Sequence, residues 1–141
     1  MRHPAPLSLT AFCRRPPDPV LLQGVAAFNA RAYWECHHLL EPLWLCTPAP
    51  ERDFFKGLIQ VAGGLYHVDR GNRAGAVSLL GKGPAYLKPF SPCCQGVAVD
   101  LCREQAAAVL DFVLASPPDL PLPRLPQALR PQLLPCPSSD T

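Results

Sequence analysis

Proline is the residue that most limits what this chain can fold into. The sequence has 19 prolines in 141 residues, and eight of them fall between Pro117 and Pro137. Each proline removes a backbone donor and disfavours helix at the residue before it. We therefore expect a disordered, proline-rich tail over 116–141 and an irregular segment over 1–17. A single ordered domain is predicted between them, over 18–115.

The first half of this domain carries two predicted helices. Asp18 followed by Pro19 is a helix start signal, because aspartate accepts hydrogen bonds from first-turn amides and proline at the first position loses no needed donor. That helix is expected to break at Asn29. Apolar spacing predicts a second helix over 33–44, and Pro42 in its last turn is expected to cause a bend or leave a carbonyl free.

The clearest helix signal lies at 52–69, where two adjoining apolar stripes fit a helix buried at the centre of a fold. Asn72 is predicted to cap a fourth helix, with a kink or break near Gly83 and Pro84. A fifth helix is predicted over 100–115, with an aspartate as its cap. Short connections between these segments favour an all-α fold, a compact bundle of about five helices with mostly antiparallel neighbours.

Charge and hydropathy argue against two classes of partner. The chain has 13 basic and 11 acidic residues and a formal net charge of +2. Nucleic acid binding usually needs a much stronger cluster of positive charge. No stretch of the sequence is long and apolar enough to cross a membrane. We therefore predict partners that are neither nucleic acid nor membrane.

The seven cysteines indicate a reducing compartment. Their number is odd, and they form neither a CxxC pair nor a spacing typical of a metal site. The first residues of the chain also lack the apolar core of a signal peptide. We therefore interpret the cysteines as reduced thiols and predict a cytoplasmic protein.

Polar side chains gather on one face of the second predicted helix. His37 and Glu41 are four residues apart and Trp44 follows three residues later, which gives the pattern HxxxExxW. On the third helix, Gln60 and His67 share a face with small residues, where another helix could approach closely. If the second helix is that neighbour, the four polar residues would form a partly buried cluster with Trp44 as its apolar wall.

These motifs resemble those of a known family. The segment 33–44, the GLIQ sequence at 57–60 and the Gly-Asn turn at 71–72 are similar to the bacterial and archaeal family catalogued as domain of unknown function 309. The resemblance covers roughly 20–114 and implies a small helical bundle with no established activity. The family usually has glutamate after the motif histidine, where this chain has His38.

Three interpretations of the polar cluster stay open. In the first, Glu41 and Gln60 orient the histidines and pair freed backbone groups, so that the cluster fixes how two helices dock. In the second, His37 is the general base of a hydrolase-type enzyme, oriented by Glu41. In the third, His38 and His67 join that pair as ligands of zinc or iron, although the sequence has neither a second ExxH nor an HExxH.

The leading hypothesis is a binding or interaction module. Its partner would be an unidentified small molecule or protein, and a homodimer is a candidate assembly because small domains with wide apolar helix faces often bury one of them in a dimer. We predict neither a metal site nor a cofactor, and the sequence does not decide whether the protein is an enzyme. Trp34 and Trp44 are expected to anchor the core, whereas an exposed tryptophan would indicate a partner-binding patch.

Overall fold

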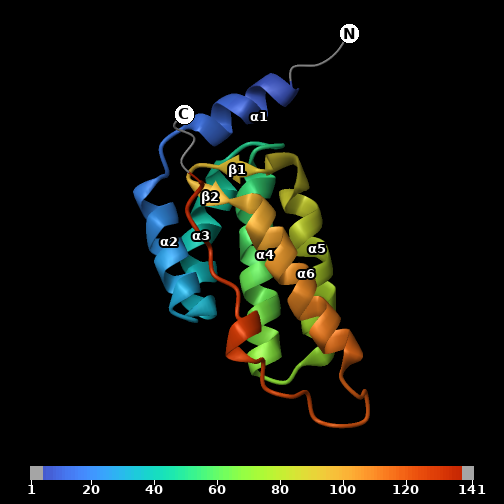
Figure 1. The fold of residues 1–141 in the computed structure, drawn as a ribbon. Helices are drawn as coiled ribbons and strands as arrows, with labels where there is room; N and C mark the ends of the chain where they lie inside the picture. Colours follow the sequence, from blue (N-terminus) through green and yellow to red (C-terminus); the bar gives the residue numbers. More distant parts are fainter. Residues whose placement is uncertain (1–4, 138–141) are drawn as a thin grey trace.

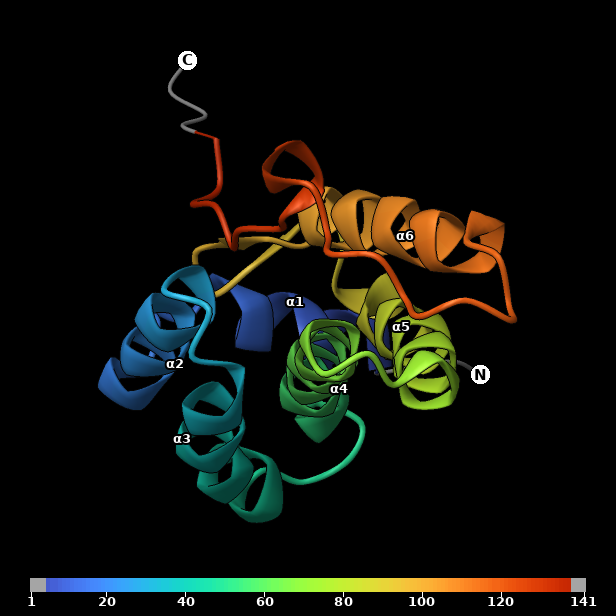
Figure 2. The same cartoon turned by 90° about the horizontal axis from the view of Figure 1, so that it is seen from below.

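The protein is a helical bundle arranged around one central helix. The computed structural model describes residues 5–137, with the backbone alone for residues 5–8. α4 lies in the middle, with α2 and α3 on one side and α5 and α6 on the other, while α1 crosses one end (Figures 1 and 2). The all-α prediction is confirmed. The helices within the described range are α1 (Ala5–Arg14), α2 (Pro19–Asn29), α3 (Tyr33–Cys46), α4 (Arg52–Asp69), α5 (Arg73–Leu87) and α6 (Val99–Ala115).

The helices with local start signals form where the sequence predicts them. Asp18 caps α2, because its Oδ1 accepts a hydrogen bond of 2.7 Å from the backbone N–H of Val20. Asn72 caps α5 in the same way, accepting from the N–H of Gly75 at 3.1 Å. α4 has the predicted bounds, and α3 continues through Pro42 to Cys46.

Glycines let α4 and α5 approach each other closely. A Cβ on Gly57 would lie 3.1 Å from the carbonyl oxygen of Gly83, and a Cβ on Gly83 would lie 3.1 Å from that of Gly57. The sequence predicts a kink or a break near Gly83 and Pro84; a break is wrong, because α5 continues through Pro84 to Leu87. Gly83 serves this helix contact instead, and the carbonyl of Pro84 accepts a hydrogen bond of 3.1 Å from Arg103 Nε.

Both ends of α6 differ from a simple capped helix. The helix begins at Val99, and Ala98 occupies the cap position without a side-chain hydrogen bond. The prediction that Asp100 is the cap is therefore wrong; its carboxylate lies in the first turn, where it favours the helix dipole. At the other end Arg73 donates to three carbonyl oxygens, those of Val113 (2.6 Å), Ser116 (3.0 Å) and Pro117 (2.9 Å).

Residues 5–14 form α1, where we expected an irregular segment over 1–17. Phe12 is buried in the core, with its ring centroid 5.8 Å from that of Phe54. Leu9, Phe12 and Cys13 recur at helical spacing, and the early Pro6 lies in the first turn, where proline is tolerated. Proline content was therefore the wrong guide to this segment. The expectation for residues 1–4 lies outside the described residues.

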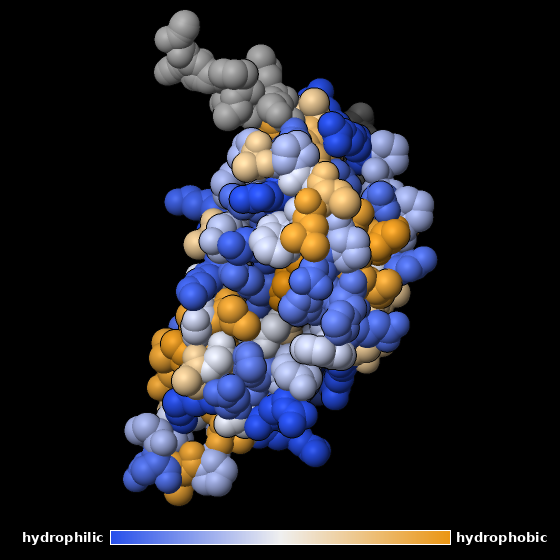
Figure 3. All heavy atoms as spheres, turned by 180° about the vertical axis from the view of Figure 1, so that it is seen from behind, coloured by the Kyte–Doolittle hydropathy of each residue, from blue (hydrophilic) through white to orange (hydrophobic). Residues whose placement is uncertain are grey.

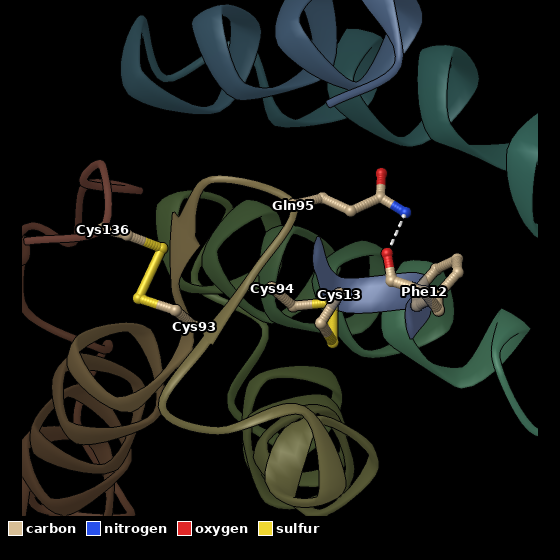
Figure 4. Close-up of a disulfide and its surroundings, with 6 residues drawn as sticks. All are labelled: Phe12, Cys13, Cys93, Cys94, Gln95 and Cys136. Carbon is tan, nitrogen blue, oxygen red and sulfur yellow. Dashed lines mark hydrogen bonds between the residues drawn. A yellow bond between two sulfur atoms is a disulfide. The ribbon is translucent and has the colours of Figure 1, made fainter. Parts of the chain in front are cut away.

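A short hairpin joins α1 and the C-terminal segment to the bundle. β1 (Cys93–Cys94) pairs antiparallel with β2 (Val97–Ala98). Both turn residues have positive φ, 46° at Gln95 and 82° at Gly96, as a tight two-residue hairpin turn requires. Gln95 is buried, and its Nε2 donates to the carbonyl of Phe12 at 3.2 Å (Figure 4). The hairpin therefore holds the end of α1.

Two disulfides reinforce this arrangement. Cys94 is bonded to Cys13 of α1, and Cys93 is bonded to Cys136 near the end of the described chain (Figure 4). Our interpretation of all seven cysteines as reduced thiols is therefore wrong for these four. The partners are 81 and 43 residues apart in the sequence, so no local spacing could reveal them. The free cysteines of the described chain are Cys36, Cys46 and Cys102.

The segment after α6 packs on the bundle rather than forming a disordered tail. Leu125 and Leu133 are buried. The side chain of Asn29 accepts from the backbone N–H of Leu133 at 2.7 Å and donates to its carbonyl at 3.1 Å. The segment forms only the short 3-10 turn η2 (Gln127–Leu129) and an isolated bridge to β2. The expectation of a disordered tail is wrong because prolines prevent a helix but do not prevent burial. An extended chain can also bury the leucines that lie between its prolines, as Leu125 and Leu133 show. Residues 138–141 lie outside the described part.

Candidate functional site

A small pocket lies between α3, α4 and α5. Its volume is about 240 Å³. α3 contributes two residues that are seven apart, α4 contributes four residues at spacings of three and four, and α5 contributes one residue. Each helix therefore presents a single face to the pocket. The lining residues are His37, Trp44, Lys56, Ile59, Gln60, Gly63 and Leu79.

Lys56 brings a positive charge to this pocket. Its ammonium nitrogen lies 5.7 Å from the centre of the Trp44 ring and 4.7 Å from that of Tyr86 on α5. Both distances are typical of cation–π contacts. Lys56 is half-buried and one helical turn before Gln60, so it lies on the face of α4 that carries the predicted site residues Gln60 and His67. We missed it, although the spacing would have revealed it.

Two buried polar atoms in the pocket residues have no partner. The indole Nε1 of Trp44 is a donor and Oε1 of Gln60 is an acceptor, and neither forms a hydrogen bond with any described residue. A buried polar group left unpaired costs about 1–3 kcal/mol. Native proteins therefore usually pair such groups, with protein, with water or with a ligand. The pocket residues can thus offer one donor, one acceptor and one positive charge around an apolar floor of Ile59 and Leu79.

The structure brings together only part of the predicted polar cluster. His37, Trp44 and Gln60 line the pocket, whereas Glu41 and His67 are not among its lining residues. Glu41 is half-buried on α3 and forms neither a hydrogen bond nor an ion pair with a described residue. The carboxylate therefore does not orient the imidazole of His37.

His67 lies in the last turn of α4 and packs against the start of α5. Its Nδ1 lies 3.1 Å from Nδ2 of Asn72, and a Cβ on Gly75 would lie 2.7 Å from its ring. The small residues of α4 do allow another helix to approach closely, as expected. That helix is α5 rather than α3. This difference explains why His67 is separated from the other polar residues.

A cluster of rings surrounds Trp34 on the surface of α3. The Trp34 ring lies 4.7 Å from that of His38, 5.9 Å from that of His37 and 5.8 Å from that of Tyr66. Trp34 is 57% exposed, so the prediction that it anchors the core is wrong. Because His37 belongs both to this cluster and to the pocket lining, the aromatic surface and the pocket adjoin each other.

Two further features bear on what the chain can bind. No group of three or more histidine, cysteine, aspartate or glutamate side chains that could hold a metal ion occurs in the described part of the chain. Among the helices of residues 5–137, none has both the length and the apolar character required to span a membrane.

Comparison with known proteins matches the middle of the chain. Residues 21–79 match a family described as domain of unknown function (DUF309). The chain is also similar to a protein of Bacillus subtilis (strain 168) named uncharacterized protein YpuF, with 45% identity over 51 residues. That alignment covers 36% of this chain and 29% of the relative, so the chain spans less than a third of the protein that it matches.

The DUF309 segment contains every residue that lines the pocket and none of the four disulfide cysteines. The neighbouring cluster around Trp34 also lies within it. The motifs at 33–44, 57–60 and 71–72 all lie within the matched segment, which runs from α2 into α5. The resemblance inferred from the sequence is confirmed over residues 21–79: this segment matches the DUF309 family.

Proposed function

We propose that the chain is a binding module that holds a small organic molecule in the pocket between α3, α4 and α5. The observation that carries the proposal is the pair of unpartnered buried atoms, Trp44 Nε1 and Gln60 Oε1, in residues that line one pocket. A ligand that accepts from the first and donates to the second would recover the energy that their burial costs. A small shift of these side chains on ligand entry would expose them.

The pocket also indicates the kind of ligand. Its volume of about 240 Å³ is below the roughly 300–1,000 Å³ typical of sites for drug-sized molecules, so the ligand is small. Ile59 and Leu79 favour an apolar body. Lys56 at the pocket favours a carboxylate or another anionic end.

A pair of glycine substitutions tests this proposal. Gly63→Leu fills the pocket, because even a Cβ at this position would lie 2.9 Å from Leu79. Gly81→Leu makes the same change on α5, where a Cβ would meet nothing within 4 Å. The assay is ligand-observed NMR with butyrate, benzoate and isobutyramide, each of which combines an apolar body with an acceptor. We expect at least one probe to bind the wild type and Gly81→Leu but not Gly63→Leu. Binding of no probe, or equal binding to both variants, would contradict the proposal.

A hydrolase-type enzyme with His37 as general base stays the alternative hypothesis. His37 lines the pocket, but Glu41 does not support its ring, so the arrangement of charges favours binding over proton transfer. The two are separated by assaying a panel of activated esters and amides. Turnover that His37→Ala abolishes at unchanged melting temperature would support the enzyme, and absence of such turnover is expected for the binding module.

Self-association stays a prediction. Trp34 and Leu45 are 57% and 66% exposed on α3, and they are eleven residues apart, which places them on one side of the helix. On the face seen in Figure 3, hydrophobic residues form separate patches among hydrophilic ones, so that face offers no single broad apolar surface. If α3 forms the homodimer interface, sedimentation will show a dimer for the wild type and a monomer for Trp34→Ala. A wild-type monomer at micromolar concentration would contradict it.

The cytoplasmic location and the limits of the folding unit also stay predictions. Cytoplasmic proteins usually keep their cysteines reduced, whereas this structure contains two disulfides. Counting the thiols of protein taken directly from cells tests the location, because seven reactive thiols after denaturation indicate a reducing compartment and three indicate an oxidising one. Expression of residues 18–115 alone tests whether that segment folds independently.

A further inference from the structure

The α2–α3 and α4–α5 turns lie at the same end of the bundle (Figure 1). Residues of both turns line a second cavity. Its volume is about 780 Å³, and it is separate from the pocket described above. The last turn of α4 forms one wall, and residues 122–130 of the C-terminal segment form another. The charged residues that line it are Arg31, Asp69, Arg70, Arg124 and Arg130.

The charge of this cavity is strongly positive. Four guanidinium groups face one carboxylate, which leaves three positive charges in excess, whereas the formal net charge of the whole chain is +2. A cavity lined by one sign of charge concentrates the field and attracts ions of the opposite sign. The basic residues of this chain are therefore not distributed evenly.

One of the four arginines has a structural partner. Nη2 of Arg130 lies 3.0 Å from Oδ1 of Asp69, and its Nη1 donates to Oδ2 at 3.2 Å and to the hydroxyl of Tyr33 at 3.2 Å. Burial alone would lower the pKa of Arg130, but its hydrogen bonds to Asp69 and Tyr33 outweigh burial and raise that pKa. Arg130 is thus a fixed cation in the wall, and its buried Nε has no hydrogen-bond partner among the described residues.

The other three arginines have no carboxylate partner within the described chain. Arg31 donates to the side-chain oxygen of Gln127, and Arg70 lies over the Tyr66 ring at 5.4 Å from its centre. Arg124 is exposed and forms no ion pair with a described residue. These three side chains come from separate parts of the chain, namely the α2–α3 turn, the end of α4 and the C-terminal segment, so the fold is what brings their charges together.

We propose that this cavity binds a small phosphorylated anion through Arg31, Arg70 and Arg124. Guanidinium groups match phosphate oxygens in a two-pronged geometry, and three of them suit a ligand with several negative charges better than a single carboxylate. The cavity is large enough for more than one phosphate group. Such a ligand would join the C-terminal segment to the helices that it covers.

Isothermal titration calorimetry with sodium pyrophosphate tests the proposal on the full chain. Arg124→Gln is the cleanest variant because its side chain has no partner to lose, and Arg70→Gln is the second. Arg52→Gln is the matched control, since Arg52 is an exposed arginine at the start of α4 and is not a lining residue. We expect each cavity variant to weaken pyrophosphate binding about tenfold or more and the control to change it about twofold or less.

Acetate at the same ionic strength distinguishes phosphate recognition from general anion attraction. Acetate is expected to bind far more weakly than pyrophosphate, and added potassium chloride is expected to weaken pyrophosphate binding. The proposal is overturned if pyrophosphate does not bind the wild type at millimolar concentration, if Arg52→Gln weakens binding as much as the cavity variants, or if acetate binds as well as pyrophosphate. Lys56 could also attract these anions to the α3–α4–α5 pocket, so Gly63→Leu, which fills that pocket, is titrated alongside and should bind pyrophosphate as tightly as the wild type does. With that control, these outcomes are independent of the test of the proposed function.

Discussion

Replacing Gln60 by methionine separates a binding site from a structural polar cluster. Methionine has nearly the same shape and length as glutamine but carries no amide. In the structure Oε1 of Gln60 is buried and lacks a hydrogen-bond partner among the described residues. If the amide is kept for a ligand, the unliganded protein should become more stable when the amide is removed.

The size of this effect follows from the cost of the unpaired atom. Leaving a buried acceptor unpaired costs about 1–3 kcal/mol, and methionine removes that cost while retaining the apolar contacts. We therefore expect Gln60→Met to raise the free energy of unfolding by about 1–2 kcal/mol. For a chain of this length, 1 kcal/mol corresponds to a rise of roughly 3–5 °C in Tm.

Urea unfolding of the unliganded protein measures this change. Gln23→Met is the matched control, because Gln23 is exposed on α2 and its replacement should change stability by about 0.5 kcal/mol or less. Any probe that binds the wild type should bind Gln60→Met more weakly. A loss of stability by about 1 kcal/mol or more in Gln60→Met would refute the reasoning. It would mean that the amide is paired in solution and serves the docking of α3 on α4.

Three other perturbations test the fold. Cys94→Ser opens the loop of 81 residues that its disulfide closes, and should lower the free energy of unfolding, measured with urea, by about 4 kcal/mol. The control Cys46→Ser changes an exposed free cysteine and should have almost no effect. Gly83→Ala should lower the free energy of unfolding by about 2 kcal/mol or more, because the added Cβ would lie 3.0 Å from the backbone nitrogen of Val61. Gly81→Ala should raise it by about 1 kcal/mol, because alanine favours a helix over glycine and the added Cβ meets nothing within 4 Å. The Tm values of the two variants measure both changes. Burial raises the pKa of the Cys36 and Cys102 thiols to about 12 from 9.0, so the folded state keeps protons that the unfolded state loses. Stability measured in urea should therefore fall as pH rises above about 9, and replacing both thiols by alanine should reduce this fall.

The parts of the fold that the sequence could predict are those determined by neighbouring residues. Asp18 and Asn72 cap helices through hydrogen bonds to residues two and three positions away. The two adjoining apolar stripes of α4 reflect its burial at the centre of the fold, between α3 and α5. α1, the packed C-terminal segment and the disulfides depend on partners far away in the chain, and no local pattern specifies such partners.

The candidate site was predictable to a similar degree. The spacing of His37 and Trp44 placed them on one face of α3, and Gln60 on a polar face of α4, as the pocket requires. The sequence could not show that α5 rather than α3 would pack on the glycines of α4, where His67 contacts Gly75 and Asn72 instead of lining the pocket. The arginine cavity was not predictable at all, since its residues come from three distant segments.

The most direct test of the proposed function is the NMR signal of the Trp44 indole N–H. Trp34 supplies an internal control, because its ring is 57% exposed and it is not a lining residue of the pocket. Addition of butyrate, benzoate or isobutyramide should shift the Trp44 signal as the N–H gains an acceptor, and should leave the Trp34 signal almost unchanged. If neither signal moves with any probe, or if both move equally, the pocket is not a binding site.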